Sequence, residues 1–424
     1  MTTTDAPLAR QRADRRTYML VTGAYWADTL TDGAIRMLVL FSFSQRGYTP
    51  LQVASLFLFY EIFGIITNLF GGYLGARFGL KTTLFLGLGT QLAALAMLAL
   101  APAAWLVVPY VMVAQALSGI AKDLTKMSSK SAVKLVAGDT SGQLYRWVSL
   151  LTGSKNAIKG VGFFLGALLL TLVGFQPALL ILGCLVLAAL LLSLIGIGGD
   201  LGAGNAKAKF GQMFSHSRAI NMLAAARIVL FGARDVWFVV ALPVFFVSAL
   251  GWDFWQVGGF LAAWTIGYGL VQAATPAILR GGQPNGRTAA ALAFGLAAFP
   301  LGIALALAAG LPPAPVVVIG LLAFGAVFAL NSAVHSYLIL AYTDGDKVAM
   351  QVGFYYMANA IGRLLGTLLS GLLYQIGLQL GGSGGLIVCL AASAALILAA
   401  GLIALLLPSH AGAAGPVSLG DLGD

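Results

Sequence analysis

The sequence has few charged residues and few of the side chains that bind metals or form disulfides. Only 9% of its 424 residues are Asp, Glu, Lys or Arg, and it contains two cysteines and three histidines. Cys184 and Cys389 both lie within apolar runs, which argues against a disulfide framework and against a cysteine metal site. We therefore expect no metal and no cofactor. Although the net charge is +10, no polar stretch is long enough for a soluble domain with a basic face, so nucleic-acid binding is not expected.

Hydrophobic residues make up most of the chain, and they occur in long runs. They account for 59% of the sequence. Runs of about 18 or more mostly apolar residues recur along it, and each is long enough to cross a bilayer as a helix. A porin-like barrel would show short segments of alternating hydrophobicity instead. The sequence therefore predicts an all-α polytopic membrane protein whose surroundings are the lipid bilayer. The polar N-terminus, up to about Tyr18, predicts that the first span is part of the fold.

Twelve membrane spans are expected, in two groups of six. A segment rich in Gly, Ala and polar residues, 199–218, separates the two groups as a linker would. The chain then divides into an N-terminal six-helix bundle over 1–198, a C-terminal six-helix bundle over 219–408 and a tail over 409–424. The expected helices are residues 17–44, 51–75, 82–101, 104–126, 145–174, 177–198, 219–248, 254–279, 288–309, 314–342, 348–376 and 385–407.

The basic residues indicate which loops face the cytoplasm. Lys and Arg collect in alternate loops, and in the opposite loops Arg46 is almost alone. Because cytoplasmic loops of membrane proteins carry the excess of Lys and Arg, both termini are expected to be cytoplasmic. Two halves joined by a linker predict a substrate site between them, near the middle of the membrane. We expect a monomer in the cytoplasmic (inner) membrane of a bacterium.

The short loop at residues 71–81, GGYLGARFGLK, resembles the signature between the second and third helices of the major facilitator superfamily, roughly G-x-L-x-D-R-x-G-x-K. The resemblance implies the major facilitator fold and a gating role for this loop. Ala76 occupies the position of the usual aspartate, so the charge partner of that role is missing. A tight cytoplasmic turn with positive-inside charges is the alternative. The matching residues are Gly72, Leu74, Arg77, Gly79 and Lys81.

Ionisable residues occur within predicted spans that, as the resemblance implies, line the central cavity. Each costs at least about 2.5–3.5 kcal/mol at membrane depth, so it normally faces a cavity or a partner. Four acids and six bases leave two uncompensated positive charges, which a bound dianion can balance. Arginine suits phosphate-like oxyanions because its fork of donors matches paired oxygens. The residues expected to balance charge or carry a proton are Asp28, Asp32, Glu61 and Asp235, and those expected to bind substrate are Arg36, Lys155, Lys159, Arg227, Arg234, Arg363, Asn331 and His335.

Structural alternatives remain open for several of these residues. Asp32 and Arg36 lie four residues apart on one helix and can neutralise each other. Arg234 and Asp235 can form a local bridge, and Arg227 can extend its side chain to the cytoplasmic interface. The histidine of the set can be a hydrogen-bonded lining residue rather than a proton carrier.

A row of lysines follows the fourth predicted helix. Lys122, Lys126 and Lys130 recur every fourth residue, which places them on one ridge of a helix. Asp123 lies beside this ridge. The ridge either flanks the membrane as a positive-inside segment or concentrates anions at the cytoplasmic entrance of the cavity.

Four segments carry a closer resemblance, to the organoarsenical efflux permeases (the ArsJ family). They are YWADTLTDGAIRMLVL, FLFYEIFGIITNLFGGYLGARFGL, QALSGIAKDLTKMSSKSAVKL and LLTGSKNAIKGVGFFLGALLL. That resemblance implies a transporter, not an enzyme, that exports 1-arseno-3-phosphoglycerate and so confers arsenate resistance. It also implies a functional link to a glyceraldehyde-3-phosphate dehydrogenase, which makes this compound when arsenate replaces phosphate. An exchanger of organophosphate and phosphate fits the interior charges equally well. A drug or sugar exporter is possible on the fold alone.

Overall fold

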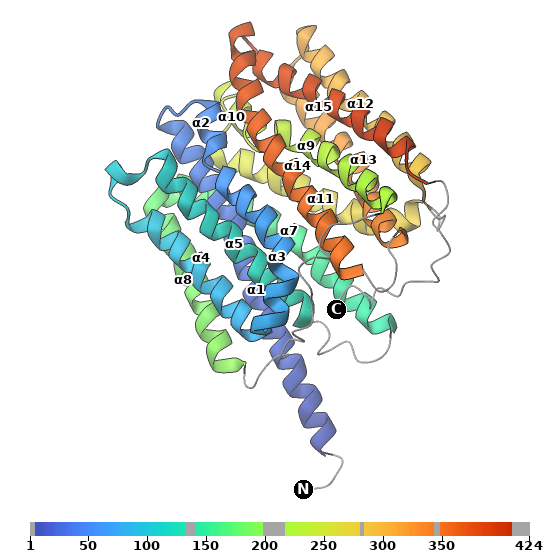
Figure 1. Cartoon of the computed structure of the whole chain (residues 1–424). Helices are drawn as coiled ribbons and strands as arrows, with labels where there is room; N and C mark the ends of the chain where they lie inside the picture. The colour runs from blue at the N-terminus through green and yellow to red at the C-terminus, as the bar shows by residue number, and fades with distance from the viewer. Residues whose placement is uncertain (1–4, 133–140, 198–216, 280–283, 343–347, 409–424) are drawn as a thin grey trace.

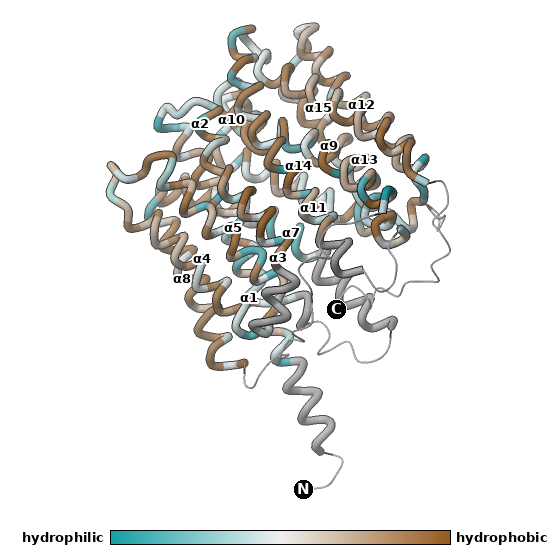
Figure 2. Tube along the Cα trace, viewed as in Figure 1, coloured by the Kyte–Doolittle hydropathy of each residue, from teal (hydrophilic) through white to brown (hydrophobic). Residues whose placement is uncertain are grey.

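The computed structural model describes residues 5–132, 141–197, 217–279, 284–342 and 348–408. Within these ranges every regular element is a helix, so the all-α fold class predicted from the sequence is confirmed. Among the described residues, ten segments are long and apolar enough to cross a membrane, and apolar residues cover most of their length in Figure 2. The long helices α1 (Asp5–Gln45) and α5 (Val108–Ala132) are not among the ten, because polar and charged residues interrupt their apolar runs.

The helices of the two halves of the chain lie side by side (Figure 1). The first half adds α2 (Pro50–Ser55), α3 (Leu58–Phe78), α4 (Leu80–Leu100), α7 (Ser141–Val173) and α8 (Phe175–Gly196) to α1 and α5. The second half consists of α9 (Arg218–Phe238), α10 (Ala241–Ser248), α11 (Phe254–Ile278), α12 (Gly286–Ala308), α13 (Pro313–Ala341), α14 (Val348–Gly377) and α15 (Gly384–Leu405). The division at the linker stays a prediction, because most of residues 199–218 and all of the tail lie outside the described residues.

Two of the predicted spans are broken helices. The span expected at 51–75 is α2 followed by α3, and the span expected at 219–248 is α9 followed by α10. At the second break the hydroxyl oxygen of Ser370 accepts hydrogen bonds from the N–H groups of Val240 and Ala241, at 3.2 and 3.0 Å. A side chain of α14 thus accepts hydrogen bonds from N–H groups that have lost their partners where the helix is interrupted. A helix can break at membrane depth only when such groups are satisfied in this way.

Glycines set the close contact between α1 and α7. A Cβ atom on Gly33 would lie 2.7 Å from the carbonyl oxygen of Lys159, and one on Gly162 would overlap the carbonyl oxygen of Leu30. Small residues of this kind let the backbones of membrane helices approach each other. The approach brings the face of α1 that carries Asp32 against the part of α7 that carries Lys159.

The two halves are tightly packed at one end of the molecule, which we call the distal end and define as the end where α1 ends and α11 begins. A Cβ atom on Gly371 of α14 would lie 2.6 Å from the carbonyl oxygen of Pro50 at the start of α2. The N–H of Leu51 donates a hydrogen bond to Gln375 Oε1 at 3.2 Å. The distal end is therefore closed, and the predicted topology places it outside the cytoplasm.

Candidate functional site

Glu61 of α3 lies where the first half of the chain meets the second. Arg36 of α1 donates from Nη2 to Glu61 Oε1 at 2.8 Å, and Arg363 of α14 donates from Nη2 to the same oxygen at 2.7 Å. Glu61 is buried, and the ring of Tyr60 lies beside both guanidinium groups, with its centroid 5.0 and 5.8 Å from their Cζ atoms. One carboxylate therefore holds two cations, one from each half.

Asp32 of α1 is the centre of a second cluster. Lys159 of α7 donates to Asp32 Oδ2 at 2.8 Å, and the hydroxyl of Tyr60 donates to Asp32 Oδ1 at 2.6 Å. Lys122 of α5 donates to the hydroxyl oxygen of Tyr60 at 3.1 Å. Both oxygens of Asp32 are thus used by other helices. The alternative pair of Asp32 with Arg36 does not form, because Arg36 pairs across helices instead.

Asp28, one turn before Asp32, has a different environment. The Thr125 hydroxyl donates to Asp28 Oδ2 at 2.6 Å. Among the described residues, Asp28 Oδ1 has no hydrogen-bond partner, and no Lys or Arg nitrogen lies within 4.0 Å of either oxygen. The carboxyl group is fully buried. Asp28 is thus held by a neutral hydroxyl group, whereas Asp32 is held by a cation.

The lysine ridge lies against α3, and Lys126 also contacts the second half, with its Nζ 5.2 Å from the ring centroid of Tyr356 on α14. Asp123 is buried and accepts a hydrogen bond from the Thr67 hydroxyl at 2.6 Å. Lys126 donates to Asn68 Oδ1 at 2.9 Å and lies 3.5 Å from Asp123 Oδ1. The helix continues to Ala132, beyond the predicted end at 126, so Lys130 lies on the same helix. The side chain of Lys130 lies outside the described set, and the entrance role stays a prediction.

Arg227 of α9 is surrounded by neutral groups. Its Nη1 donates to the carbonyl oxygen and the hydroxyl oxygen of Ser332 at 3.2 and 3.1 Å, and its Nε donates to Asn359 Oδ1 at 3.3 Å. Its Cζ lies 3.8 Å from the ring centroid of Phe231. Of the carboxylates that the structure describes, none lies within 4.0 Å of Arg227. With 5% of its surface exposed, this arginine is buried rather than extended to the interface.

The remaining predicted residues of the second half are Arg234, Asp235, Asn331 and His335. Arg234 Nε donates to Asp235 Oδ1 at 2.7 Å, so the local bridge is the arrangement that forms. Asn331 and His335 are buried on α13. In the described part of the chain, neither the Asn331 amide nor His335 Nδ1 has a hydrogen-bond partner. In the first half, Lys155 lies half-buried on α7, one turn before Lys159.

The predicted gating loop is a sharp turn between α3 and α4. Gly79 is its one residue between the two helices and has φ of 74°, in the left-handed region that favours glycine. Lys81 follows at the start of α4, with its Nζ 5.9 Å from the ring centroid of Phe85. Gly72 and Arg77 lie in α3, in a stretch whose side chains are outside the described set. The alternative of a tight turn therefore explains the glycine at position 79, and the gating role of the loop stays a prediction.

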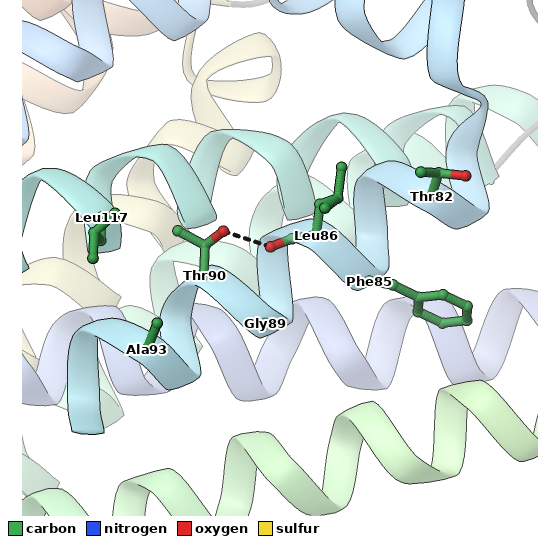
Figure 3. A pocket seen from close by; sticks show the side chains of 7 residues that line it. All are labelled: Thr82, Phe85, Leu86, Gly89, Thr90, Ala93 and Leu117. Atoms are coloured by element: carbon green, nitrogen blue, oxygen red, sulfur yellow. Dashed lines mark hydrogen bonds between the residues drawn. The ribbon is translucent and has the colours of Figure 1, made fainter. Parts of the chain in front are cut away.

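A hollow of about 490 Å³ lies on the outer surface of α4 (Figure 3). Its only drawn hydrogen bond is internal to the helix, from the Thr90 hydroxyl to the Leu86 carbonyl oxygen at 2.7 Å. It contains none of the charged residues above, so it is not the candidate site. Its lining residues are Thr82, Phe85, Leu86, Gly89, Thr90, Ala93 and Leu117. Among the described residues, no group of three or more His, Cys, Asp or Glu side chains is placed to hold a metal ion.

Prediction from charged residues missed the neutral partners that complete these clusters. All but one of these neutral partners lie on helices that also carry a predicted site residue. A polar side chain inside such a span is therefore the sequence signal by which these partners can be identified. The partners missed are Tyr60, Thr67, Asn68, Thr125, Tyr268, Ser332 and Asn359.

Comparisons with known proteins agree with the helical architecture. A family model described as the Major Facilitator Superfamily matches residues 21–334. A solved structure, described as giving structural insights into substrate recognition in proton-dependent oligopeptide transporters, is similar with a TM-score of 0.69 and 15% sequence identity. The similarity covers 92% of this chain and 98% of that one. A comparison with curated protein sequences gives no match.

Proposed function

The chain belongs to the Major Facilitator Superfamily and is a membrane transporter rather than an enzyme, and we propose that it exports a small organic oxyanion. The observation that supports this proposal is the excess of positive charge where the two halves meet. Arg36 and Arg363 share a single carboxylate oxygen of Glu61. Because uncompensated charge is costly inside a membrane, an anionic substrate is the ligand that this arrangement favours.

The proposed substrate is 1-arseno-3-phosphoglycerate, on the basis of the sequence resemblance to organoarsenical efflux permeases. It carries a phosphoryl and an arsenyl group, and arginine forks match the paired oxygens of both. Export of this compound would remove arsenate from the cell once a glyceraldehyde-3-phosphate dehydrogenase has made it. We propose that the protein acts in the bacterial inner membrane with both termini in the cytoplasm.

Transport would follow alternating access, with the two halves rocking about the site between them. Arg36, Arg363 and Arg227 would bind the oxyanion groups, and Lys122 and Lys126 would attract the anion along α5. Lys159 and Asp32 would keep α1 and α7 in register. Closure of the distal end, with Gly371 of α14 packed against Pro50, corresponds to a state in which the substrate site cannot open to the outside.

Everted membrane vesicles test this proposal. Glyceraldehyde-3-phosphate dehydrogenase, glyceraldehyde 3-phosphate, NAD and arsenate are supplied outside, at the cytoplasmic face, and arsenic that accumulates inside is measured. We expect arsenic to accumulate only when every component is present. Arg36→Gln should abolish this accumulation without lowering the level of folded protein, because Glu61 keeps Arg363 as a partner. The matched control is Arg46→Gln, an arginine at the distal end that packs on Phe43 and Phe175. Wild-type accumulation by Arg36→Gln would contradict the proposal.

Competition separates the alternatives. An oxyanion exporter predicts that 3-phosphoglycerate inhibits accumulation and that sugars, cationic dyes and dipeptides do not. The dipeptide is included because the similar solved structure concerns oligopeptide transporters. An organophosphate exchanger, which the same charges favour, would be revealed by inhibition with glycerol phosphate and by flux that requires phosphate on the opposite side. Inhibition by dyes or sugars alone would indicate a drug or sugar exporter.

A further inference from the structure

The ion cluster at Glu61 joins the two halves through one oxygen atom. The hydrogen bonds of Arg36 and Arg363 to this carboxylate both use Nη2, and both end on Oε1. Each guanidinium group has five N–H donors, so this arrangement uses only part of either fork. A carboxylate that two arginines approach through single bonds is a weaker partner than an oxyanion bound through paired bonds.

We propose that Glu61 is an internal counter-ion that the transported oxyanion displaces from Arg36 and Arg363. The inference rests on the proposed function, because it assumes that the ligand is an anion. A phosphoryl, arsenyl or carboxylate group can offer two oxygens to each fork, whereas Glu61 offers one oxygen to both. In the ligand-free protein Glu61 compensates the buried arginines, and in the complex the substrate does.

The exchange has a consequence for the fold. Glu61 belongs to α3 and Arg363 to α14, so their ion pair links the first half to the second. At the distal end the two halves are also joined by the hydrogen bond from Leu51 to Gln375 and by the packing of Gly371. Displacement of Glu61 breaks the direct ion pair between α3 and α14. The substrate then bridges Arg36 and Arg363 at the site, and the distal end keeps only its neutral contacts between the halves. Binding of an anion therefore loosens the closed distal end, which is the step an exporter requires after it has loaded substrate.

The first test measures equilibrium binding of 3-phosphoglycerate to the purified full-length protein in nanodiscs. Because Glu61 competes with the ligand, we expect Glu61→Gln to bind 3-phosphoglycerate at least about fivefold more tightly than the wild type does. The matched control is Asp253→Asn, which removes a carboxylate at the N-terminus of α11 and keeps a side chain that can cap the helix. Its affinity is expected to stay within about twofold of wild type, since it lies on neither arginine.

The second test leaves Glu61 intact, so it also holds if Glu61→Gln does not fold. Spin labels are placed at two exposed positions of the distal end, Gln45→Cys and Gln379→Cys, in a Cys184→Ser background; Cys389 is buried. Electron–electron resonance should show the label distances lengthening when 3-phosphoglycerate is added, and not when glycerol is added.

The outcomes separate this inference from the proposed function. If the wild type neither binds 3-phosphoglycerate nor transports an anion, the proposed function is wrong. If it binds and transports the anion while Glu61→Gln binds no more tightly and the distal distances stay unchanged, displacement of Glu61 is wrong and anion transport stands. Tighter binding by Glu61→Gln together with longer distal distances in the wild type supports the inference.

Discussion

Buried charges are compensated in different ways at the Asp32 and Glu61 clusters of the first half and at Arg227 of the second half. In the first half, Asp32 is paired with Lys159, and Glu61 with Arg36 and, across the interface, Arg363. In the second half, Arg227 is held by the oxygens of Ser332 and Asn359 and by the face of Phe231. The two clusters of the first half compensate charge with charge, whereas Arg227 is compensated by neutral groups.

This difference separates structural charge from charge that is available to a ligand. A buried ion pair whose partners both remain is neutral as a unit, and removing one partner exposes the other. A guanidinium that is compensated only by dipoles and an aromatic face keeps its attraction for an anion, because neutral groups leave its net charge in place. The aromatic face contributes about 2 kcal/mol or somewhat more when desolvated. Loss of Lys159 should therefore lower stability, and loss of Arg227 should lower ligand affinity.

The largest effect is expected for Lys159→Met, which leaves Asp32 buried without a cation. We expect a loss of about 3–5 kcal/mol in the free energy of unfolding. Thermal unfolding in detergent measures it, and the double variant Asp32→Asn/Lys159→Met serves as the control because it removes both charges. The prediction is contradicted if Lys159→Met is as stable as the wild type, or if the double variant is no more stable than Lys159→Met.

Arg227→Gln should have the opposite character. We expect the affinity for 3-phosphoglycerate to fall by about 1.5–3 kcal/mol, the contribution of hydrogen bonds to a charged group. The melting temperature should stay the same or rise, since a buried cation without a carboxylate partner has been removed. Binding and thermal unfolding are measured on the same preparation, with Arg46→Gln as the control. A large drop in stability with unchanged affinity would assign Arg227 to the structure instead.

The contact that creates the Asp32–Lys159 pair can be tested through its glycines. Gly162→Ala forces a methyl group against the carbonyl oxygen of Leu30 and should cost about 1–3 kcal/mol of stability. A Cβ atom on Gly89 of α4 would meet none of the described neighbours within 4 Å, so Gly89→Ala should be neutral or stabilising. Equal effects of the two substitutions on thermal unfolding would show that the contact is looser than described.

The smallest effect is expected for Asp28→Asn. The amide oxygen of asparagine can still accept the hydrogen bond from Thr125, and no buried cation loses its partner, so stability should change by about 1 kcal/mol or less. Asp32→Asn, one turn along the same helix, should cost several times more because it leaves Lys159 unpaired. Unfolding of the two variants side by side checks this, and equal losses would show that Asp28 is also paired with a charge.

The sequence predicted the spans well because apolar runs of membrane length leave few alternatives. The breaks between α2 and α3 and between α9 and α10 were not predictable, since apolar residues continue through both. Their positions depend on tertiary partners such as Ser370, which lies on another helix and accepts from the freed N–H groups.

The charged residues of the candidate site were identifiable, but their partners were not. Periodicity placed Asp32 and Arg36 on one face of a helix and left their mutual pairing open. The structure pairs each with another helix, because glycine contacts and helix packing, rather than spacing along α1, decide which side chains meet. For Arg227 the sequence left two interpretations open, substrate binding and extension to the cytoplasmic interface, and only the fold reveals that α13 and α14 enclose it.

The most direct measurement compares how three-carbon compounds of increasing charge stabilise the wild-type protein: glycerol, glycerate and 3-phosphoglycerate. A ligand that binds the folded state raises stability by about 2.7 kcal/mol at a concentration of 100 times its Kd. If the arginines between the two halves form the site, the rise in melting temperature should increase with charge and be largest for 3-phosphoglycerate. Equal shifts for all three compounds, or a shift for glycerol alone, would contradict an anion site between the two halves.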